Sequence, residues 1–368
     1  MILIGHNPPP ITGQSEAFAY LLETLESSGF NCRVVDIGSH LENRKVGKFS
    51  FARTFEILLA IFNFIKHLLR NNTQAVYISV GISKIGFIRD LIFLWLSYLW
   101  SVPVLIQLHG GGYKEFYLAQ SKLWRRIIKK TLSIPKKIIV LSSSLEDQFD
   151  FLDNYSSKIE IIHNTAIINL SNKVERKDKK HFTILYMSNL IESKGYLDLL
   201  EAAKYLKNDK IKIIFCGAFI DSEHNIESTL KDFLSQVEKT SLYGNVEYLG
   251  VVSGKQKWEI YQSSDVFVLP TYYQYEGQPI SIIEAMAFGL PIISTDYRGI
   301  KDMVINNVNG FYVNPQSPKE IAEKIKKLFE DQILARKMGE ESKRIYEESF
   351  SPEVNRKRNL DLFASIEN

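Results

Sequence analysis

The sequence predicts an α/β protein made of two doubly wound domains, each with its own parallel sheet. Three observations support this: the chain has 368 residues, short apolar runs alternate with helical patterns in both halves, and a polar, charged stretch separates the halves. A chain of this length can bury two cores. Strands that alternate with helices form parallel sheets with right-handed crossovers. We expect a first domain over residues 1–168, a linker over 169–180, a second domain over 181–350 and a C-terminal helix over 351–368.

The expected strands are short runs rich in β-branched and aromatic residues. They span residues 2–6, 32–37, 75–80, 103–108, 137–142, 159–163, 182–188, 211–216, 245–249, 265–269, 291–295 and 310–313. Helical patterns fill much of the sequence between them. They span residues 16–28, 56–69, 91–100, 196–206, 257–262 and 318–329.

Residues 91–108 carry no charge and are long enough to suggest a membrane span. Pro103 interrupts them, and the residues after it have the short apolar form of a buried parallel strand. We therefore interpret the segment as a core helix followed by a strand.

Composition indicates a soluble protein of a reducing compartment. Hydrophobic residues make up 45% of the chain and charged residues 24%, which is ordinary for a globular protein. Cys32 and Cys216 are the only cysteines, so a disulfide framework is not expected. The apolar run at residues 1–6 is short and three prolines follow it closely, unlike a secretory signal. We expect a cytoplasmic protein, either free or peripheral on the inner face of the cell membrane.

The formal net charge is only +3, but residues 114–137 are strongly basic, with eight lysines and arginines against Glu115 alone. Trp124, Ile127 and Ile128 lie among these charges, so one interpretation is an amphipathic surface attracted to anionic lipid. The other is the solvated face of an ordinary helix. Nucleic acid is not an expected partner, because the overall charge is low and no nucleic-acid-binding motif is present.

The most specific feature lies at residues 275–295. Glu276 and Glu284 bracket a loop and the start of a helix, with Pro279 expected in the first turn and Gly289 expected to end the helix. The free amides of a first turn and the positive end of the helix dipole bind anions such as a diphosphate. Glu284 is then expected to accept hydrogen bonds from ribose hydroxyls.

The string EGQPxSxxEAMAxGxPxxxT at residues 276–295 resembles glycosyltransferase family 4. That family is a group of retaining transferases with the GT-B fold. The resemblance implies two Rossmann-like domains that face a cleft, with the C-terminal helix crossing back to the first domain. It also implies a nucleotide diphosphate sugar as donor. No cofactor and no metal are expected, since no His/Cys cluster or suitably placed acidic pair is present.

The resemblance also assigns roles in catalysis and diphosphate binding. Glu276 would position the sugar, and His109, which stands before three glycines at the end of an expected strand, would lie beside the sugar and the leaving phosphate. Gly13 would approach the diphosphate. Lys194 would clamp it, although Asn189 stands where the family usually has arginine. Either Asn189 donates a neutral hydrogen bond, or another cation such as Arg298 compensates.

The remaining positions would bind other parts of the donor. Gly217, Val251 and Val252 would contact the base through the backbone, and the backbone of Gly277, Gln278, Pro279 and Ile280 would contact the sugar hydroxyls and the distal phosphate. Proline has no amide hydrogen, so Pro279 can only help to shape that loop.

The predicted function is retaining transfer of a sugar to a glycan acceptor, expected to be lipid-linked, in the assembly of capsule, O-antigen or exopolysaccharide. Two alternatives are open. The first is a membrane scaffold that binds a nucleotide sugar with impaired catalysis, which the substitutions Thr12 and Asn189 would suit. The second is a GT-B nucleotide-sugar 2-epimerase.

Overall fold

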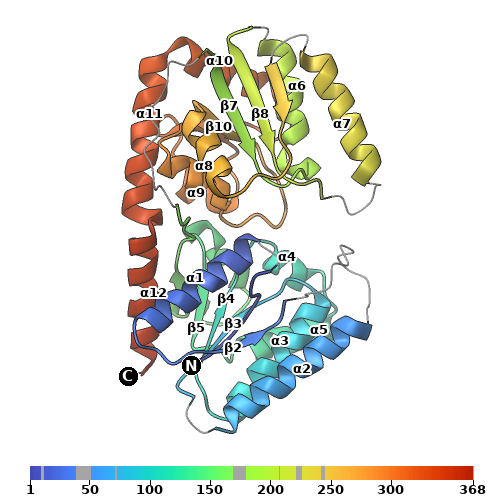
Figure 1. The fold of residues 1–368 in the computed structure, drawn as a ribbon. Coiled ribbons are helices and arrows are strands. Elements are labelled where there is room, and N and C mark those ends of the chain that lie inside the picture. Colours follow the sequence, from blue (N-terminus) through green and yellow to red (C-terminus); the bar gives the residue numbers. More distant parts are fainter. Residues whose placement is uncertain are drawn as a thin grey trace. The chain divides into compact units, whose positions relative to one another are not determined.

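The computed structural model describes residues 1–9, 12–38, 51–70, 73–168, 180–206, 208–220, 226–241 and 245–367. The chain forms two compact units, the first made of Met1–Asn164 with Pro352–Asn368 and the second of Thr165–Ser351 (Figure 1). The expected linker, residues 169–180, lies outside the described residues except for Lys180.

The first unit contains a six-stranded parallel sheet. Across the sheet the strands run β2 (Arg33–Asp36), β1 (Ile2–Gly5), β3 (Val76–Ser79), β4 (Val104–Gln107), β5 (Lys137–Val140) and β6 (Ile159–Ile161). Its helices and 3₁₀ turns are α1 (Gly13–Ser27), α2 (Phe51–Leu68), α3 (Lys84–Leu99), α4 (Tyr113–Leu118), α5 (Lys122–Leu132), η1 (Ser143–Phe149), η2 (Tyr155–Ser157) and α12 (Pro352–Glu367).

Two helical layers cover this sheet. Because side chains alternate along a strand, Ile2 and Ile4 join one core and Leu3 the other. Helices α2, α3 and α5 supply the first core, which includes Phe64 and Phe93. Helices α1 and α12 supply the second. The C-terminal helix therefore packs within the first unit, as the GT-B prediction implies.

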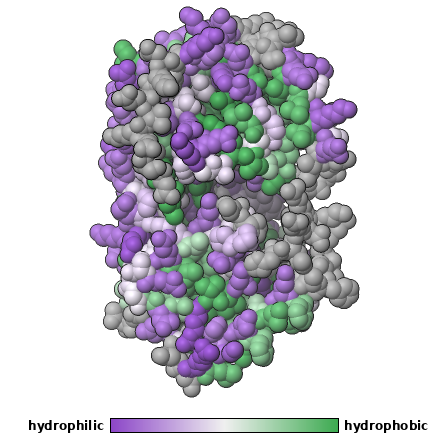
Figure 2. Space-filling view, viewed as in Figure 1, coloured by the Kyte–Doolittle hydropathy of each residue, from purple (hydrophilic) through white to green (hydrophobic). Residues whose placement is uncertain are grey.

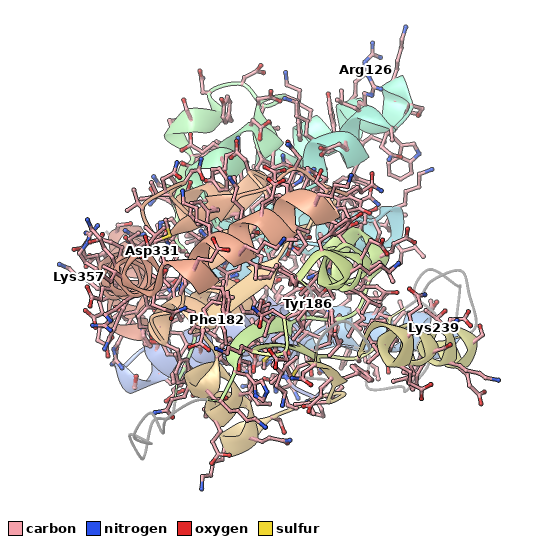
Figure 3. The ribbon with its side chains drawn as sticks, turned by 90° about the horizontal axis from the view of Figure 1, so that it is seen from above. Arg126, Phe182, Tyr186, Lys239, Asp331 and Lys357 are labelled. Atoms are coloured by element: carbon pink, nitrogen blue, oxygen red, sulfur yellow. The ribbon has the colours of Figure 1, made fainter. Side chains whose placement is uncertain are left out.

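The second unit also contains a six-stranded parallel sheet. Its strands run β12 (Gly310–Tyr312), β11 (Ile292–Ser294), β10 (Val266–Leu269), β7 (Phe182–Met187), β8 (Ile211–Cys216) and β9 (Asn245–Tyr248). Figure 3 labels Phe182 and Tyr186 on β7. Its helical elements are η3 (Glu192–Lys194), α6 (Tyr196–Leu206), α7 (Ile226–Ser241), α8 (Gly254–Ser263), α9 (Ile280–Ala287), η4 (Arg298–Asp302), α10 (Pro318–Glu330), α11 (Gln332–Ile345) and the π-turn η5 (Tyr346–Phe350).

Each sheet has a point at which the strand order reverses. In the first sheet it lies between β1 and β3, and in the second between β7 and β10. Ligands of doubly wound sheets bind beyond the carboxyl ends of the strands at such a point. The loops that follow these four strands are therefore the places to look for a site.

The fold prediction is confirmed. Every expected strand is present, and residues 91–108 form the end of α3 followed by β4. Within the described part of the chain, no helix has the length and apolarity needed to cross a membrane. Cys32 and Cys216 are both free thiols.

Candidate donor site in the second unit

Glu276 lies in the loop that follows β10, and its side chain is almost fully buried, at 5% exposure. The hydroxyl of Thr271 donates to Glu276 Oε2 over 2.9 Å. The ammonium of Lys194 lies 3.5 Å from the same oxygen. The short bond from Thr271 fixes the carboxylate, whereas the longer ion pair leaves Lys194 able to hold a second anion.

Lys194 reaches Glu276 because the loop after β7 packs against the loop after β10. The amide of Tyr272 donates to Ser193 O over 2.7 Å. Gly195 has a φ of +76°, and a Cβ there would lie 2.5 Å from Pro270 O, so only glycine fits this close approach. The Lys194 ammonium also lies 5.4 Å from the centre of the Tyr273 ring. The predicted pair of Glu276 and Lys194 thus lies at the point where the second sheet reverses its strand order.

Glu284 is on α9, with 4% of its surface exposed. Lys257 Nζ contacts its Oε1 at 2.5 Å, and the hydroxyl of Tyr261 donates to its Oε2 over 2.8 Å. Burial, and then the charge of Glu284, raise the pKa of Tyr261 well above its ordinary value. The phenol therefore stays protonated and continues to donate at neutral pH.

Helix α9 begins one residue later than the sequence suggested. Pro279 is its N-cap, with φ −61° and ψ 115°, and Ile280 is the first helical residue. Placing Pro279 in the first turn was wrong, because its extended ψ keeps it outside the helix. Among the described residues, the amides of Gly277, Ile280 and Ser281 meet no protein acceptor. The turn therefore has unpaired amides, and anion binding by them stays a prediction.

The end of α9 is as expected. Gly289 has a φ of +67°, its amide donates to Met286 O, and the amide of Leu290 donates to Ala285 O. These two bonds form a Schellman motif, which satisfies the last carbonyls of the helix.

The Gly277–Gln278 backbone lies close to η4. A Cβ on Gly299 would stand 2.4 Å from Gly277 O, so η4 can approach this loop only with glycine at that position. Arg298, the neighbouring residue, has a φ of +46° and donates from Nε to the Tyr297 hydroxyl over 3.0 Å. Arg298 is therefore the sequence neighbour of Gly299, which packs against the loop whose amides are candidates for binding phosphate.

The positions predicted to contact the base also lie together. The amide of Gly217, after β8, donates to Gly250 O over 2.8 Å. A Cβ on Gly217 would stand 1.9 Å from Ser188 O, which brings the loops after β7, β8 and β9 side by side. Val251 is exposed, Val252 is half-buried, and the Asn189 side chain is exposed to solvent.

Three side chains that hold the glutamates had not been predicted: Thr271, Lys257 and Tyr261. No sequence pattern indicated that Thr271 would hydrogen-bond to Glu276. Lys257 and Tyr261 are four residues apart on α8 and so share one helical face. That spacing was the only available signal, and it did not indicate which carboxylate they would meet.

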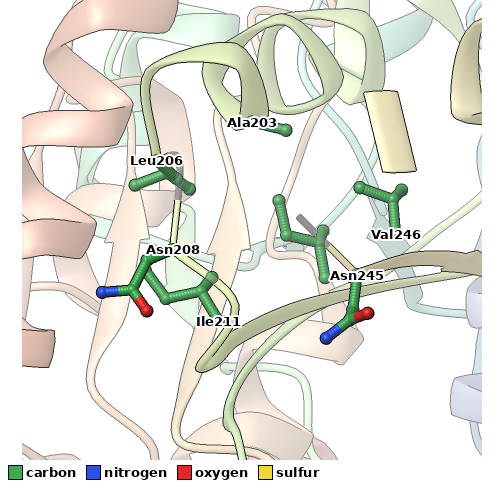
Figure 4. A pocket seen from close by; sticks show the side chains of 7 residues that line it. Ala203, Leu206, Asn208, Ile211, Asn245 and Val246 are labelled. Carbon is green, nitrogen blue, oxygen red and sulfur yellow. The ribbon is translucent and has the colours of Figure 1, made fainter. Parts of the chain in front are cut away.

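A small hollow in this unit is not part of the site. It lies between the end of α6 and the amino ends of β8 and β9, at the opposite edge of the sheet from the loops above (Figure 4). Apart from two asparagines its lining is apolar: Ala203, Leu206, Asn208, Ile211, Ile213, Asn245 and Val246. It offers no cation to a phosphate.

In the first unit, His109 stands two residues after the end of β4. The Tyr77 hydroxyl donates to Gln107 Oε1 over 2.6 Å and lies 3.4 Å from His109 Nε2. In the tautomer with the proton on Nε2, His109 donates a hydrogen bond to the Tyr77 oxygen, which in turn donates to Gln107. The buried Nδ1 of His109 has no hydrogen-bond partner in the described part of the chain. It is left as an acceptor for a ligand hydroxyl.

The predicted Gly13 contact lies at the start of α1. Thr12 is the N-cap of this helix: its hydroxyl accepts from the Ser15 amide, and Ser15 Oγ accepts from the Thr12 amide over 2.8 Å. Thr12, where the family usually has glycine, therefore forms a capping box that stabilises the helix start. Gln14 in the first turn donates to Ser79 Oγ at the end of β3 over 2.6 Å.

We expect His109 to make unfolding depend on pH. Burial, and then the charge of His6, lower the pKa of His109 from 6.5 to about 4. Between those values the unfolded chain binds the proton and the folded chain does not, so the free energy of unfolding falls by about 2–3 kcal/mol as the pH drops from 6.5 to 4. His109→Gln should flatten this slope in denaturation curves measured across the range. His181→Gln, in the other unit, serves as control, and an unchanged slope in His109→Gln would contradict the prediction.

Residues 168–345 match the family described as glycosyl transferases group 1. The chain carries a glycosyl transferases group 1 domain. This match covers the loops of Lys194, Gly217, Val251 and Glu276 and the whole of α9.

Relatives of this chain include two bacterial enzymes that are named as glycosyltransferases. It is 27% identical over 319 residues, 80% of each chain, to the capsular polysaccharide biosynthesis glycosyltransferase CapM of Staphylococcus aureus. It is 32% identical over 157 residues to the N,N'-diacetylbacillosaminyl-diphospho-undecaprenol α-1,3-N-acetylgalactosaminyltransferase of Campylobacter jejuni. That second match covers 43% of this chain and 38% of the relative.

Solved structures share the fold. HepE of Anabaena, in complex with UDP, aligns with a TM-score of 0.76 at 16% identity, over 99% of both chains. Sucrose-phosphate synthase of Thermosynechococcus elongatus aligns with a TM-score of 0.76 at 18% identity, over 99% of this chain and 98% of that one. The chain therefore has the GT-B fold.

Proposed function

We propose that this protein is a retaining glycosyltransferase of the family 4 type that moves a sugar from a nucleotide diphosphate sugar to a lipid-linked glycan acceptor. One observation carries the proposal. Glu276 and Glu284 are both buried and each is held by a lysine from a different element, at either end of a segment whose first-turn amides have no protein acceptor.

The donor would occupy this segment from one end to the other. The open amides of Gly277, Ile280 and Ser281, with the dipole of α9, would bind the diphosphate together with Lys194. Glu284 would accept from the ribose hydroxyls through the lone pairs that Lys257 and Tyr261 leave unused.

The other predicted donor positions keep their proposed roles. The backbones of Gly217, Val251 and Val252 would contact the base, and Gln278 the sugar. Asn189 is exposed and has no charge, so the second cation on the diphosphate would be Arg298, which adjoins the Gly277 loop.

Glu276 and His109 would act on the sugar itself. Glu276, fixed by Thr271, would position the sugar and stabilise the positive charge that develops at the anomeric carbon. His109, neutral above pH 4, would accept from a sugar hydroxyl through Nδ1. Gly13 would lie near the diphosphate.

We propose that transfer proceeds with retention through an oxocarbenium-like state, with the acceptor entering on the leaving-group side. The acceptor hydroxyl forms the new bond to the anomeric carbon while the bond to the diphosphate oxygen breaks, and that oxygen takes the acceptor proton. Lys194 and the α9 amides would stabilise the departing diphosphate without a metal. Chelation with EDTA should therefore leave the rate unchanged.

The relatives support a role in surface-glycan assembly. The name of CapM assigns it to capsular polysaccharide, and the name of the Campylobacter relative assigns it an acceptor linked to diphospho-undecaprenol. HepE has been solved with UDP and glucose. We propose a UDP-sugar donor and a role in capsule, O-antigen or exopolysaccharide assembly, on the cytoplasmic side of the membrane.

Nucleotide diphosphate release in the presence of UDP- and GDP-sugars and a lipid-linked glycan tests the proposal. Transfer predicts release together with a glycosylated product. Binding of a donor without release under any acceptor would favour the impaired scaffold, and a changed sugar configuration at C2 of the donor would favour the 2-epimerase.

A further inference from the structure

Helix α2 has apolar side chains on its outer side as well as on its core side. Phe55, Leu58, Leu59 and Phe62 are exposed by 62%, 58%, 47% and 66%. They recur every three or four residues, so they form one stripe along the helix, away from the buried Phe64. A surface helix of a globular protein normally carries polar residues on that side.

Helix α3 adds a second stripe in the same layer. Ile85 and Ile88 are exposed at its start, and Tyr98 and Leu99 are exposed at its end by 59% and 68%. α2 and α3 pack on the same side of the first sheet. Hydrophobic side chains gather at the lower right of Figure 2, where Figure 1 shows α2.

Helix α5 borders these stripes with positive charge. Lys122, Arg126 and Lys130 are exposed and lie four residues apart, which places them on one face. The ammonium of Lys130 lies 5.4 Å from the centre of the Trp95 ring, which joins this face to α3. Arg126 projects outward from α5 (Figure 3). Further exposed cations stand at the end of α2 and at the start of α3: Lys66, Arg70 and Lys84.

Some of the cations in residues 114–137 are paired with acidic residues and so are less available to bind lipid phosphates. Lys114, Lys129 and Lys137 pair with acidic residues of the same unit, Asp150, Asp153 and Glu160, at 2.5, 2.9 and 2.5 Å. Lys122, Arg126 and Lys130 form no ion pair within the described residues. The acidic residues of α2, α3 and α5 are Glu56 and Asp90. Asp90 is buried against Arg89, so it does not oppose an anion at the surface.

We infer that the outer sides of α2, α3 and α5 form a docking face for an anionic lipid bilayer. The apolar stripes enter the boundary between headgroups and acyl chains, and the cations contact lipid phosphates. A second copy of the chain would be a poor occupant, because its face carries the same positive charge. This face would give the proposed transferase a membrane partner, but lipid binding itself does not depend on sugar transfer.

Flotation of the full-length protein with vesicles tests this face. Pure phosphatidylcholine vesicles are compared with an equal mixture of phosphatidylcholine and phosphatidylglycerol, and salt-sensitive binding is expected for the mixture only. Phe55→Ser with Phe62→Ser should weaken binding at least tenfold, because two aromatic side chains lose their burial in lipid. Lys122→Gln with Arg126→Gln should weaken it about 25-fold, since each cation near the surface changes binding about fivefold.

Matched controls come from the second unit. Ile333 is 81% exposed and the Lys255 side chain 80% exposed, so Ile333→Ser and Lys255→Gln should leave binding unchanged. Full binding by the double phenylalanine variant would overturn the proposal. So would a protein that floats with neither vesicle and sediments as a dimer that this variant dissociates. The flotation assay contains no sugar donor or acceptor, so it measures lipid binding separately from catalysis. A protein that binds vesicles but releases no nucleotide in the transfer assay would contradict the proposed transfer and leave the docking face standing.

Discussion

Lys194→Met is expected to lower kcat/KM for sugar transfer by about 10³-fold, and Glu276→Gln by about 10²–10³-fold. Removing one charged group that stabilises a transition state typically costs about this much. Lys194→Met removes the cation that would bind the leaving diphosphate, and it also leaves the buried Glu276 charge without its partner at 3.5 Å. Glu276→Gln keeps the side-chain shape and can still accept from Thr271, but it removes the negative charge beside the sugar.

Initial rates of nucleotide release measure both effects, with circular dichroism to check that each variant is folded. Lys204→Met is the matched control, because this lysine also pairs with a glutamate but is half exposed. If Lys194→Met keeps more than a tenth of the activity, Lys194 is not the diphosphate clamp. If circular dichroism shows that Lys194→Met has lost helix, Lys194→Gln becomes the test of diphosphate binding, because it removes the charge but keeps a polar side chain.

The sequence predicted the elements of the fold well because their signals are local. Strands such as residues 182–188 are buried on both faces and therefore read as continuous apolar runs. The order of strands across each sheet is a different matter. The rule for parallel crossovers fixes their hand but not which strands become neighbours, so the reversal between β7 and β10 became visible only in the structure.

The sequence predicted candidate site residues where they form a continuous string, and it missed contacts that are assembled from distant segments. Glu276, Pro279 and Glu284 lie in one motif, although the N-cap position of Pro279 depends on a ψ angle that sequence does not give. Thr271 and Lys257 act through contacts that only folding creates. The same holds for the basic stretch 114–137. Its charges can be counted in the sequence, but the sequence does not reveal which of them pair with acidic residues of the segment that follows.

The second large effect is expected from Lys257, whose ammonium meets the buried Glu284 at 2.5 Å. Lys257→Met removes the cation that neutralises that buried carboxylate, so we expect the free energy of unfolding to fall by about 2–3 kcal/mol. This is below the ~3–5 kcal/mol typical of breaking a fully buried pair, because the lysine side chain is 22% exposed. Glu284→Gln should cost less, about 1 kcal/mol, since Lys257 can turn toward solvent. The double variant should lose less than the sum, with a coupling energy of about 1–2 kcal/mol.

A pair of equal length but different burial gives the control. Lys204 and Glu201 also meet at 2.5 Å, but their side chains are 52% and 44% exposed. The same cycle there should yield a coupling energy of at most about 0.5 kcal/mol, because solvent screens exposed pairs. Denaturant unfolding followed by circular dichroism measures the free energies of unfolding for both cycles. Equal coupling in the two cycles would mean that Lys257 does not hold Glu284 in place, and the proposed ribose contact would then lose its main structural support.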